Sequence, residues 1–144
     1  MAYTYQYPRL SLTVDAVVFK TIGAKTSVLL IQRKNEPFKG KWALPGGFVD
    51  MEETLETAVQ RELEEETGLK NIELYQLHAF SALGRDPRGR TVSVVFWGIV
   101  KNEAVPVSGD DAAQARWFEV ENIPILAFDH DDVLRMALAK INNK

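Results

Sequence analysis

The sequence predicts a mixed α and β fold in which helices cover a sheet. Segments that read as strands, rich in β-branched residues and alternating in polarity, outnumber the segments with a helical period. One of the two amphipathic helices also lies in mid-chain, between strands. No repeat, low-complexity stretch or Pro/Gly/Ser linker divides the 144 residues. We therefore expect a single domain over residues 1–144.

The expected strands follow one another along the chain at 11–19, 27–33, 72–81, 91–100 and 114–120. Residues 35–47, rich in Pro, Gly and Lys, are expected to be mostly loop, and residues 85–90 a turn. Tyr3, Tyr5 and Tyr7 alternate as the side chains of an edge strand do. The N-terminal segment is therefore expected to add an edge strand to the sheet.

Two segments have the period of an amphipathic helix. The first is expected over residues 54–67, and Gly68 ends it. The second is expected over residues 129–142, with Asp129 as its N-cap. Each presents an apolar stripe, so we expect both helices to pack on the sheet.

Composition excludes several classes of function. The net charge of −3, from 17 basic and 20 acidic residues, has the wrong sign for a protein that coats a nucleic acid. The longest apolar run, from Val92 to Val100, falls far short of the roughly 20 residues that cross a bilayer. The first residues carry no secretion signal, so a cytoplasmic protein is expected.

Composition also limits the metal chemistry. The chain has no cysteine, which excludes thiolate sites, disulfides and a thiol nucleophile. With only two histidines, a site built from several imidazoles is excluded as well. Any metal is therefore expected to be held mainly by oxygen ligands, as Mg²⁺ or Mn²⁺ are.

The first predicted helix carries carboxylates on its buried side. On a helical wheel, Glu62 and Glu66 fall in the same stripe as Leu55 and Leu63, and Glu65 lies to one side of it. The residues expected to point into solvent are Glu56, Gln60 and Glu64. Two carboxylates ~6 Å apart repel by roughly 3 kcal/mol at an effective dielectric near 20.

Two interpretations of this helix remain open at this point. The helix is merely acidic with a solvated last turn, or its carboxylates bind a divalent cation. The crowding of Glu64, Glu65 and Glu66 just before Gly68 favours the second, because anionic side chains at a helix C-terminus oppose the macrodipole.

The same segment resembles the Nudix box, G-x5-E-x7-R-E-U-x-E-E-x-G-U, where U is a bulky aliphatic residue. Every fixed position is filled, by Gly47, Glu53, Arg61, Glu62, Leu63, Glu65, Glu66, Gly68 and Leu69. The segments 42–48 and 115–118 are also similar to the family. The resemblance implies an α/β/α sandwich with a mixed sheet. It also implies Mg²⁺-dependent hydrolysis of a nucleoside diphosphate linked to another moiety.

The resemblance assigns roles to individual residues of the box. Four groups are implied as metal ligands: the carboxylates of Glu62, Glu65 and Glu66, and the carbonyl of Gly46. Glu65 is alternatively implied to hold the attacking water. Arg61 is implied as a positioning residue that holds a carboxylate such as Glu53.

The general base stays open between two places in the sequence. One is Glu65, and the other is the loop 108–114, where Asp111 and Asp110 are available. Asp110 is more readily explained as a solvated turn residue. Many relatives have Glu where this chain has Gln114, and because an amide is no base, this departure weakens a mechanism that relies on position 114.

The segments 35–47, 85–96 and 126–132 are similar to the ADP-ribose pyrophosphatase branch of the family. Arg33, Arg88 and Arg90 are candidates to bind the diphosphate, and Arg33 and Arg88 are the two assigned to the substrate. The candidates to stack on adenine are Phe38, Trp42 and Phe128, of which Phe38 is assigned to the substrate. Ordinary turns and loop-closing aromatics are the structural alternative. Members of this family often form homodimers, and the alternating tyrosines are compatible with a partner subunit.

The function predicted first is Mg²⁺-dependent hydrolysis of ADP-ribose, a small-molecule nucleotide, to AMP and ribose 5-phosphate. A second possibility keeps the chemistry but changes the substrate to a nucleotide sugar, a dinucleotide or a modified triphosphate. A third is a regulator that senses ADP-ribose through a Nudix-like domain and binds DNA through a winged helix. The intact box, the acidic charge and the short segment after the last helix argue against the third.

Overall fold

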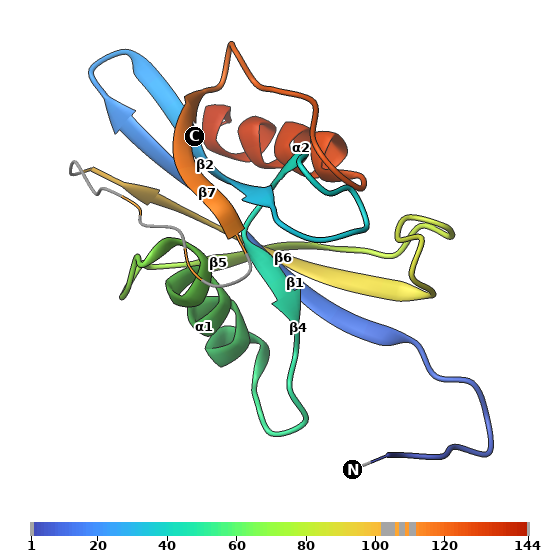
Figure 1. Ribbon diagram of the computed structural model, residues 1–144. Helices are drawn as coiled ribbons and strands as arrows, with labels where there is room; N and C mark the ends of the chain where they lie inside the picture. Colours follow the sequence, from blue (N-terminus) through green and yellow to red (C-terminus); the bar gives the residue numbers. More distant parts are fainter. Residues whose placement is uncertain (1, 102–105, 107–108, 110–111, 144) are drawn as a thin grey trace.

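A computed structural model describes residues 2–101, 106, 109 and 112–143. The strands are β1 (Ser11–Ile22), β2 (Lys25–Arg33), β3 (Trp42–Ala43), β4 (Gly46–Phe48), β5 (Tyr75–Phe80), β6 (Thr91–Val100) and β7 (Ala112–Glu119). The helices are α1 (Leu55–Thr67) and α2 (His130–Asn142). Figure 1 shows the sheet between the two helices, with α1 below it and α2 above it.

Strand β1 is the centre of the sheet. It pairs with β6 in parallel over residues 11–20, from Ser11 opposite Thr91 to Lys20 opposite Val100. It pairs with β2 and β4 in the antiparallel sense. The main path through the described strands runs β3-β2-β1-β6-β5, with β4 joined to β1 and β7 to β2. The sheet is therefore mixed, as expected.

The side chains of β1 alternate between two cores, one on each face of the sheet. Val17 and Phe19 pack in the cluster that contains Val133 and Leu134 of α2. On the other face, the cluster that contains α1 is formed by Val14, Ala16, Val18, Ala58, Val59 and Leu63. Because both faces of β1 are buried, the strand has a nearly continuous apolar sequence. This arrangement is the predicted α/β/α sandwich.

The limits of α1 follow from its capping residues. Thr54 has an extended backbone, and its side chain accepts a hydrogen bond of 3.1 Å from the Thr57 N–H. Gly68 takes a left-handed conformation with φ of 75° and donates its N–H to the Glu64 carbonyl. The predicted helix and its stop are confirmed. Gln60 was expected in solvent, but it is partly buried and donates to the Ile72 carbonyl, so that expectation is wrong.

Residues 35–47 are mostly loop, as expected, and contain the short strand β3 and the start of β4, which pair with β2 and β1. One further expectation is wrong. The segment with Tyr3, Tyr5 and Tyr7 forms no strand. Asp129 is the N-cap residue of α2, as expected, but its side chain makes no capping bond. Both of its carboxylate oxygens accept hydrogen bonds from Arg85 instead.

In the part of the chain that the structure describes, neither helix combines the length and the apolar character needed to cross a membrane.

Candidate active site

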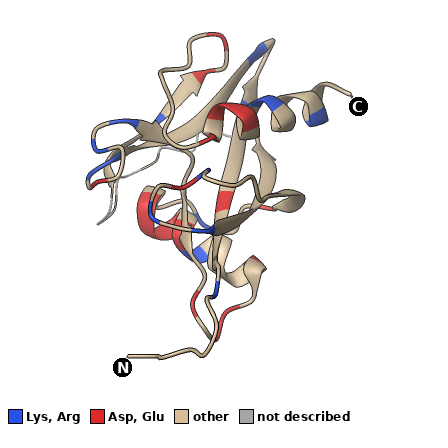
Figure 2. Ribbon diagram, turned by 90° about the vertical axis from the view of Figure 1, so that its right-hand side faces the viewer, with Lys and Arg blue, Asp and Glu red and all other residues tan. Residues whose placement is uncertain are grey.

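A cavity of about 460 Å³ lies where β1, β4 and α1 meet the chain before α2. Two parts of its lining differ in charge. The acidic wall consists of Glu62 and Glu66, which extend from α1. The basic wall consists of Arg33, Arg88 and Phe128, which come from three separate segments. Figure 2 shows how acidic residues gather on α1.

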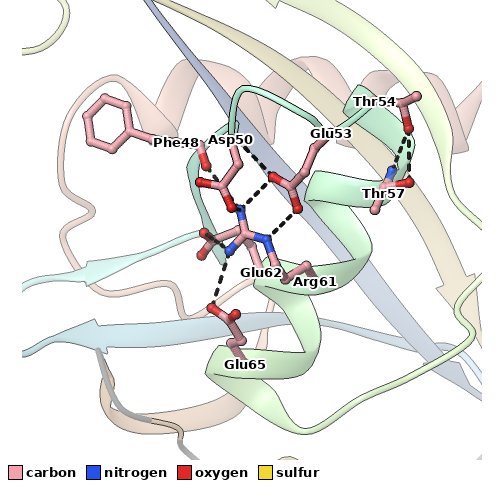
Figure 3. Close-up of polar contacts among 8 residues, drawn as sticks. All are labelled: Phe48, Asp50, Glu53, Thr54, Thr57, Arg61, Glu62 and Glu65. Atoms are coloured by element: carbon pink, nitrogen blue, oxygen red, sulfur yellow. Dashed lines mark hydrogen bonds and ion pairs between the residues drawn. The ribbon is translucent and has the colours of Figure 1, made fainter. Parts of the chain in front are cut away.

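Arg61 is the hub of the polar contacts on the exposed side of α1 (Figure 3). Its Nε donates to Glu53 Oε2 at 2.5 Å and its Nη2 to Glu53 Oε1 at 2.9 Å. Its Nη1 donates to Glu62 Oε1 at 2.8 Å and to Glu65 Oε2 at 3.3 Å. Nη2 also reaches the Phe48 carbonyl at 3.1 Å. With Asp50 Oδ2 at 3.7 Å from Nη2, one guanidinium thus joins two carboxylates of the loop after β4 to two carboxylates of α1.

These contacts change the acidity of the groups involved. The hydrogen bond from Arg61, followed by that from the Asp50 N–H, lowers the pKa of Glu53 to about 2. The bond to Glu53 in turn raises the pKa of Arg61. Arg61 therefore stays charged, and the carboxylate that it binds most strongly is that of Glu53. This is the positioning contact that the resemblance implied.

The strand β4 approaches the acidic wall through two glycines. The Gly46 N–H donates to Glu66 Oε1 at 2.7 Å, and Glu66 is only 6% exposed. A Cβ on Gly47 would lie 2.6 Å from the carboxylate of Glu62, closer than any real contact. A side chain at residue 47 would therefore displace the Glu62 carboxylate from its place beside β4. The burial expected for Glu66 from the helical wheel is confirmed.

The donor set of the acidic wall fits a hard divalent cation in kind. The carboxylates of Glu62 and Glu66 and the carbonyl of Gly46 are oxygen donors, and all three residues line the cavity. The absence of a Cβ on Gly47 leaves the Glu62 carboxylate its place beside β4. In this arrangement, no group of three or more His, Asp or Glu side chains in the described residues converges on one point. Glu65 is 55% exposed and, like Glu62, is turned onto Arg61.

The basic wall brings two guanidiniums to one aromatic ring. Arg33 and Arg88 lie 5.1 and 5.4 Å from the centre of Phe128. The Nε of Arg33 donates to the Pro37 carbonyl at 2.6 Å. Arg88 forms a two-pronged contact of 3.1 and 2.8 Å with Asp86, whose carboxylate is buried. Burial, followed by the charge of Arg88, lowers the pKa of Arg33, so an anion beside Arg33 would relieve both effects.

The predicted aromatic residues are separated by the structure. Phe128 borders the cavity. The rings of Phe38 and Phe128 pack edge to face, with 4.8 Å between their centres. Phe38 is not among the described residues that line the cavity. Trp42 packs against Phe118 instead. The sequence favoured Phe38 for substrate binding, but Phe128 is the aromatic residue of the three that borders the cavity. This choice depends on contacts between distant segments.

The loop proposed to supply a base is only partly described. Asp110 and Asp111 lie outside the described residues. Nearby, the Gly109 N–H donates to the Glu66 carbonyl at 3.2 Å, which places that glycine against the end of α1. Gln114 pairs with Gln32, and its side chain donates to that of Gln32.

Sequence reasoning missed three buried polar residues at the cavity. Asp15 lies on β1 within an apolar run, and Asp86 in the segment 85–90 holds Arg88. His130 was expected as a helix-start residue, and it does begin α2, but its ring also borders the cavity. A charged residue within an otherwise apolar strand was the signal that would have identified Asp15.

Comparison with known proteins identifies the family. The model of the NUDIX domain matches residues 10–137. The chain belongs to the Nudix family. It is 44% identical to an ADP-ribose pyrophosphatase of Methanocaldococcus jannaschii, over 91% of this chain and 73% of that protein. Family and identity together make this Nudix chain a pyrophosphohydrolase, as expected.

Two further relatives extend the comparison. The chain is 38% identical to the ADPR responsive transcriptional repressor NtrR of Acinetobacter baylyi, over 96% of this chain but only 57% of the repressor. The Nudix domain of Shewanella oneidensis NrtR, solved with ADP ribose, superposes with a TM-score of 0.88 at 34% identity and covers 94% of this chain and 90% of that domain. A MutT/nudix family protein from Enterococcus faecalis, at 35% identity, gives a TM-score of 0.90 over 99% of this chain and 66% of that protein. The Nudix fold is thereby confirmed.

Proposed function

We propose that this Nudix protein hydrolyses ADP-ribose to AMP and ribose 5-phosphate in a Mg²⁺-dependent reaction. The observation that carries the proposal is the division of one cavity into an acidic wall and a basic wall. A diphosphate diester needs cationic groups around its oxygens and a site that activates water. The identity to an ADP-ribose pyrophosphatase, 44% over most of the chain, supports the choice of substrate.

The basic wall binds the substrate in this proposal. Arg33 and Arg88 contact the diphosphate oxygens, since guanidinium groups match phosphate geometry. Asp86 keeps Arg88 in place through its two hydrogen bonds. Phe128, whose ring centre is 5.1 and 5.4 Å from the two guanidiniums, offers an apolar surface to the adenine.

The acidic wall carries out the chemistry. Glu62, Glu66 and the Gly46 carbonyl hold the metal, which when bound supplies Lewis acidity and lowers the pKa of water. Arg61 holds Glu53 and, through it, the loop after β4. The water oxygen forms a bond to phosphorus, the anhydride P–O bond breaks, and the water's proton passes to a carboxylate. Glu65 and Asp111 remain the two candidate bases.

The direct test is a substrate panel with purified protein and Mg²⁺. ADP-ribose, ADP-glucose, NAD and 8-oxo-dGTP are incubated separately, and the products are separated by ion-pair chromatography. We expect ADP-ribose to have the highest kcat/KM, with AMP and ribose 5-phosphate formed in equal amounts. Chelation with EDTA is expected to stop the reaction, and added Mg²⁺ to restore it. Faster turnover of the triphosphate would replace the proposed substrate.

A second candidate function follows from the repressor similarity, because ADP-ribose sensing uses the same ligand. The two functions differ in turnover: a sensor binds ADP-ribose without cleaving it. Calorimetric binding of ADP-ribose with no product after prolonged incubation would favour the sensor. A salt-sensitive gel shift with DNA would strengthen that result.

Other expectations belong to the same proposal and stay predictions. They are the single domain over residues 1–144, the cytoplasmic location, the absence of nucleic-acid and membrane partners, and the possible homodimer. Size-exclusion chromatography with light scattering measures the last of these.

A further inference from the structure

A buried polar corner lies in the wall of the cavity, apart from the Nudix box. It consists of Asp15 on β1, Ser93 on β6 and His130 at the start of α2, and we name it the Asp15–His130 corner. Asp15 and His130 are 7% and 4% exposed, and both border the cavity. The proposed mechanism uses neither residue. Burying a carboxylate and an imidazole is unfavourable unless both find partners, so the corner needs an explanation.

The tautomer of His130 follows from its contacts. Its Nδ1 accepts a hydrogen bond of 3.0 Å from the Leu44 N–H, so Nδ1 carries no proton. Burial is the largest effect on the pKa of His130 and lowers it, which keeps the imidazole neutral near pH 7. The single ring proton must therefore be on Nε2. This nitrogen is a hydrogen-bond donor in the cavity wall.

The donor on Nε2 has no hydrogen-bond acceptor among the described residues. The nearest carboxylate oxygen, Asp15 Oδ1, is 3.9 Å away, too far for a direct bond. Asp15 Oδ2 is already used, because it accepts a hydrogen bond from the Ser93 hydroxyl. No buried side-chain nitrogen or oxygen among the described residues lacks a partner, so Nε2 and Asp15 Oδ1 open onto the cavity, 3.9 Å apart. An oxygen placed about 2.8 Å from both would fit between them.

The group that fits this gap must both accept and donate. A phosphate oxygen accepts from Nε2–H but repels the Asp15 carboxylate. A carbonyl offers no proton to Asp15. A hydroxyl group satisfies both, because it accepts from His130 and donates to Asp15. The corner is therefore complementary to an alcohol and rejects an anion.

We propose that the Asp15–His130 corner is a subsite that binds one sugar hydroxyl of the substrate. The inference rests on the proposed function, since it assigns a role within the same cavity. It explains how the enzyme distinguishes a nucleoside diphosphate sugar from other anhydrides of equal charge. A site that hydrogen-bonds a substrate hydroxyl discriminates strongly against analogues without it, because its own buried polar groups are then left unpaired.

Two amide variants of His130 separate its two nitrogens. In His130→Asn, the side-chain oxygen replaces Nδ1 and retains an acceptor for the Leu44 N–H, while the Nε2 donor is lost. In His130→Gln, the longer amide supplies a donor near Nε2 and gives up the Leu44 contact. Asp15→Asn replaces the carboxylate by an amide of the same size. It tests the same subsite if the His130 variants do not fold. His78→Asn, on an exposed strand residue, is the control.

The experiment compares KM for ADP-ribose with KM for three analogues in the presence of Mg²⁺. Two analogues lack the 2′- or the 3′-hydroxyl of adenosine, and the ethyl ester of ADP lacks the second ribose. For the wild type, we expect one analogue to have a KM about tenfold higher than that of ADP-ribose. His130→Asn and Asp15→Asn are expected to raise KM for ADP-ribose about tenfold and to abolish that difference. His130→Gln is expected to retain the difference in KM between ADP-ribose and that analogue. His78→Asn is expected to have the KM values of the wild type.

Equal loss of kcat/KM for all four compounds in His130→Asn would overturn the subsite, because a merely structural role predicts that result. Equal KM values of the wild type for all four would overturn it as well, since a gap filled only by water predicts them. Neither result would contradict the proposed function, the hydrolysis of ADP-ribose. A wild type that neither binds nor cleaves ADP-ribose would overturn the proposed function and the subsite together.

Discussion

The two walls of the cavity are built in different ways. The acidic wall comes from one turn of α1. Its Glu62 accepts a hydrogen bond from the adjacent Arg61, and its Glu66 accepts one from the Gly46 N–H of β4. The basic wall is assembled from the end of β2, the segment before β6 and the segment before α2. No single element fixes its geometry.

The charge balance of the walls differs as well. Glu62 shares a guanidinium with Glu53 and Glu65 even without a ligand. In the basic wall, two guanidiniums lie near one ring, and burial and the charge of Arg88 lower the pKa of Arg33. The acidic wall is therefore stable without substrate, whereas the basic wall gains most from an incoming anion. The first is expected to determine kcat and the second KM.

The largest effect is expected from the acidic wall. Glu62→Gln removes a charge that the proposal assigns to the metal, while the amide oxygen can still accept from Arg61. Loss of an outer partner of a metal ligand costs roughly 10–100-fold, and loss of the ligand itself should exceed 100-fold in kcat. Steady-state hydrolysis of ADP-ribose measures the effect, and thermal unfolding checks that the fold persists.

The matched control for this variant is Glu64→Gln. Glu64 lies on the same helix, is exposed, and its carboxylate is 3.5 Å from Lys70. Because exposed ion pairs contribute little, activity should stay within about twofold of the wild type. Similar losses in both variants would mean that kcat depends on the overall acidity of α1 rather than on the acidic wall.

A smaller loss of kcat is expected when the contact between Arg61 and Glu53 is weakened. Arg61→Lys retains the charge but not the fork that binds both oxygens of Glu53. We expect kcat to fall roughly 10–100-fold. The pKa of Glu53 should rise from about 2 toward its ordinary value of 4.5, as measured by NMR titration.

The same contact predicts a pH dependence. A carboxylate whose pKa is lowered by folding stabilises the fold above its unfolded pKa, and this contribution is lost as the pH falls. The wild type should therefore lose stability between about pH 4.5 and pH 2, and Arg61→Lys should lose less over that range. Arg135→Lys, an exposed residue paired with Asp132 at 2.9 Å, is the control. Equal acid sensitivity of Arg61→Lys and the wild type would exclude a role of Arg61 in lowering this pKa.

The acidic wall could be predicted from the sequence because its order is local. The helix, its Gly68 stop and the burial of Glu66 all depend on residues within one element and were confirmed. The sandwich was predicted for a similar reason, since apolar alternation reports which strands are buried. The expected edge strand at the N-terminus failed because alternation specifies no partner for a strand.

The basic wall and the Asp15–His130 corner could not be predicted in this way. Arg33 and Arg88 were candidates, but the sequence favoured Phe38, whereas the ring beside both guanidiniums is that of Phe128. The meeting of Asp15 with His130 depends on the packing of α2 near β1. The capping role expected for Asp129 was overridden by Arg85, a residue distant in sequence. Tertiary contacts of this kind leave no periodic signal.

The smallest effect is expected from the basic wall, and it falls on binding. Arg33→Ala should raise KM for ADP-ribose about tenfold and leave kcat nearly unchanged, because a contact made equally in ground and transition states affects KM alone. Arg88→Ala should act in the same direction. Arg90→Ala is the control, since Arg90 bonds to the Ser81 carbonyl outside the cavity lining. A fall in kcat with unchanged KM in Arg33→Ala would assign Arg33 to the chemical step and end the division of labour between the two walls.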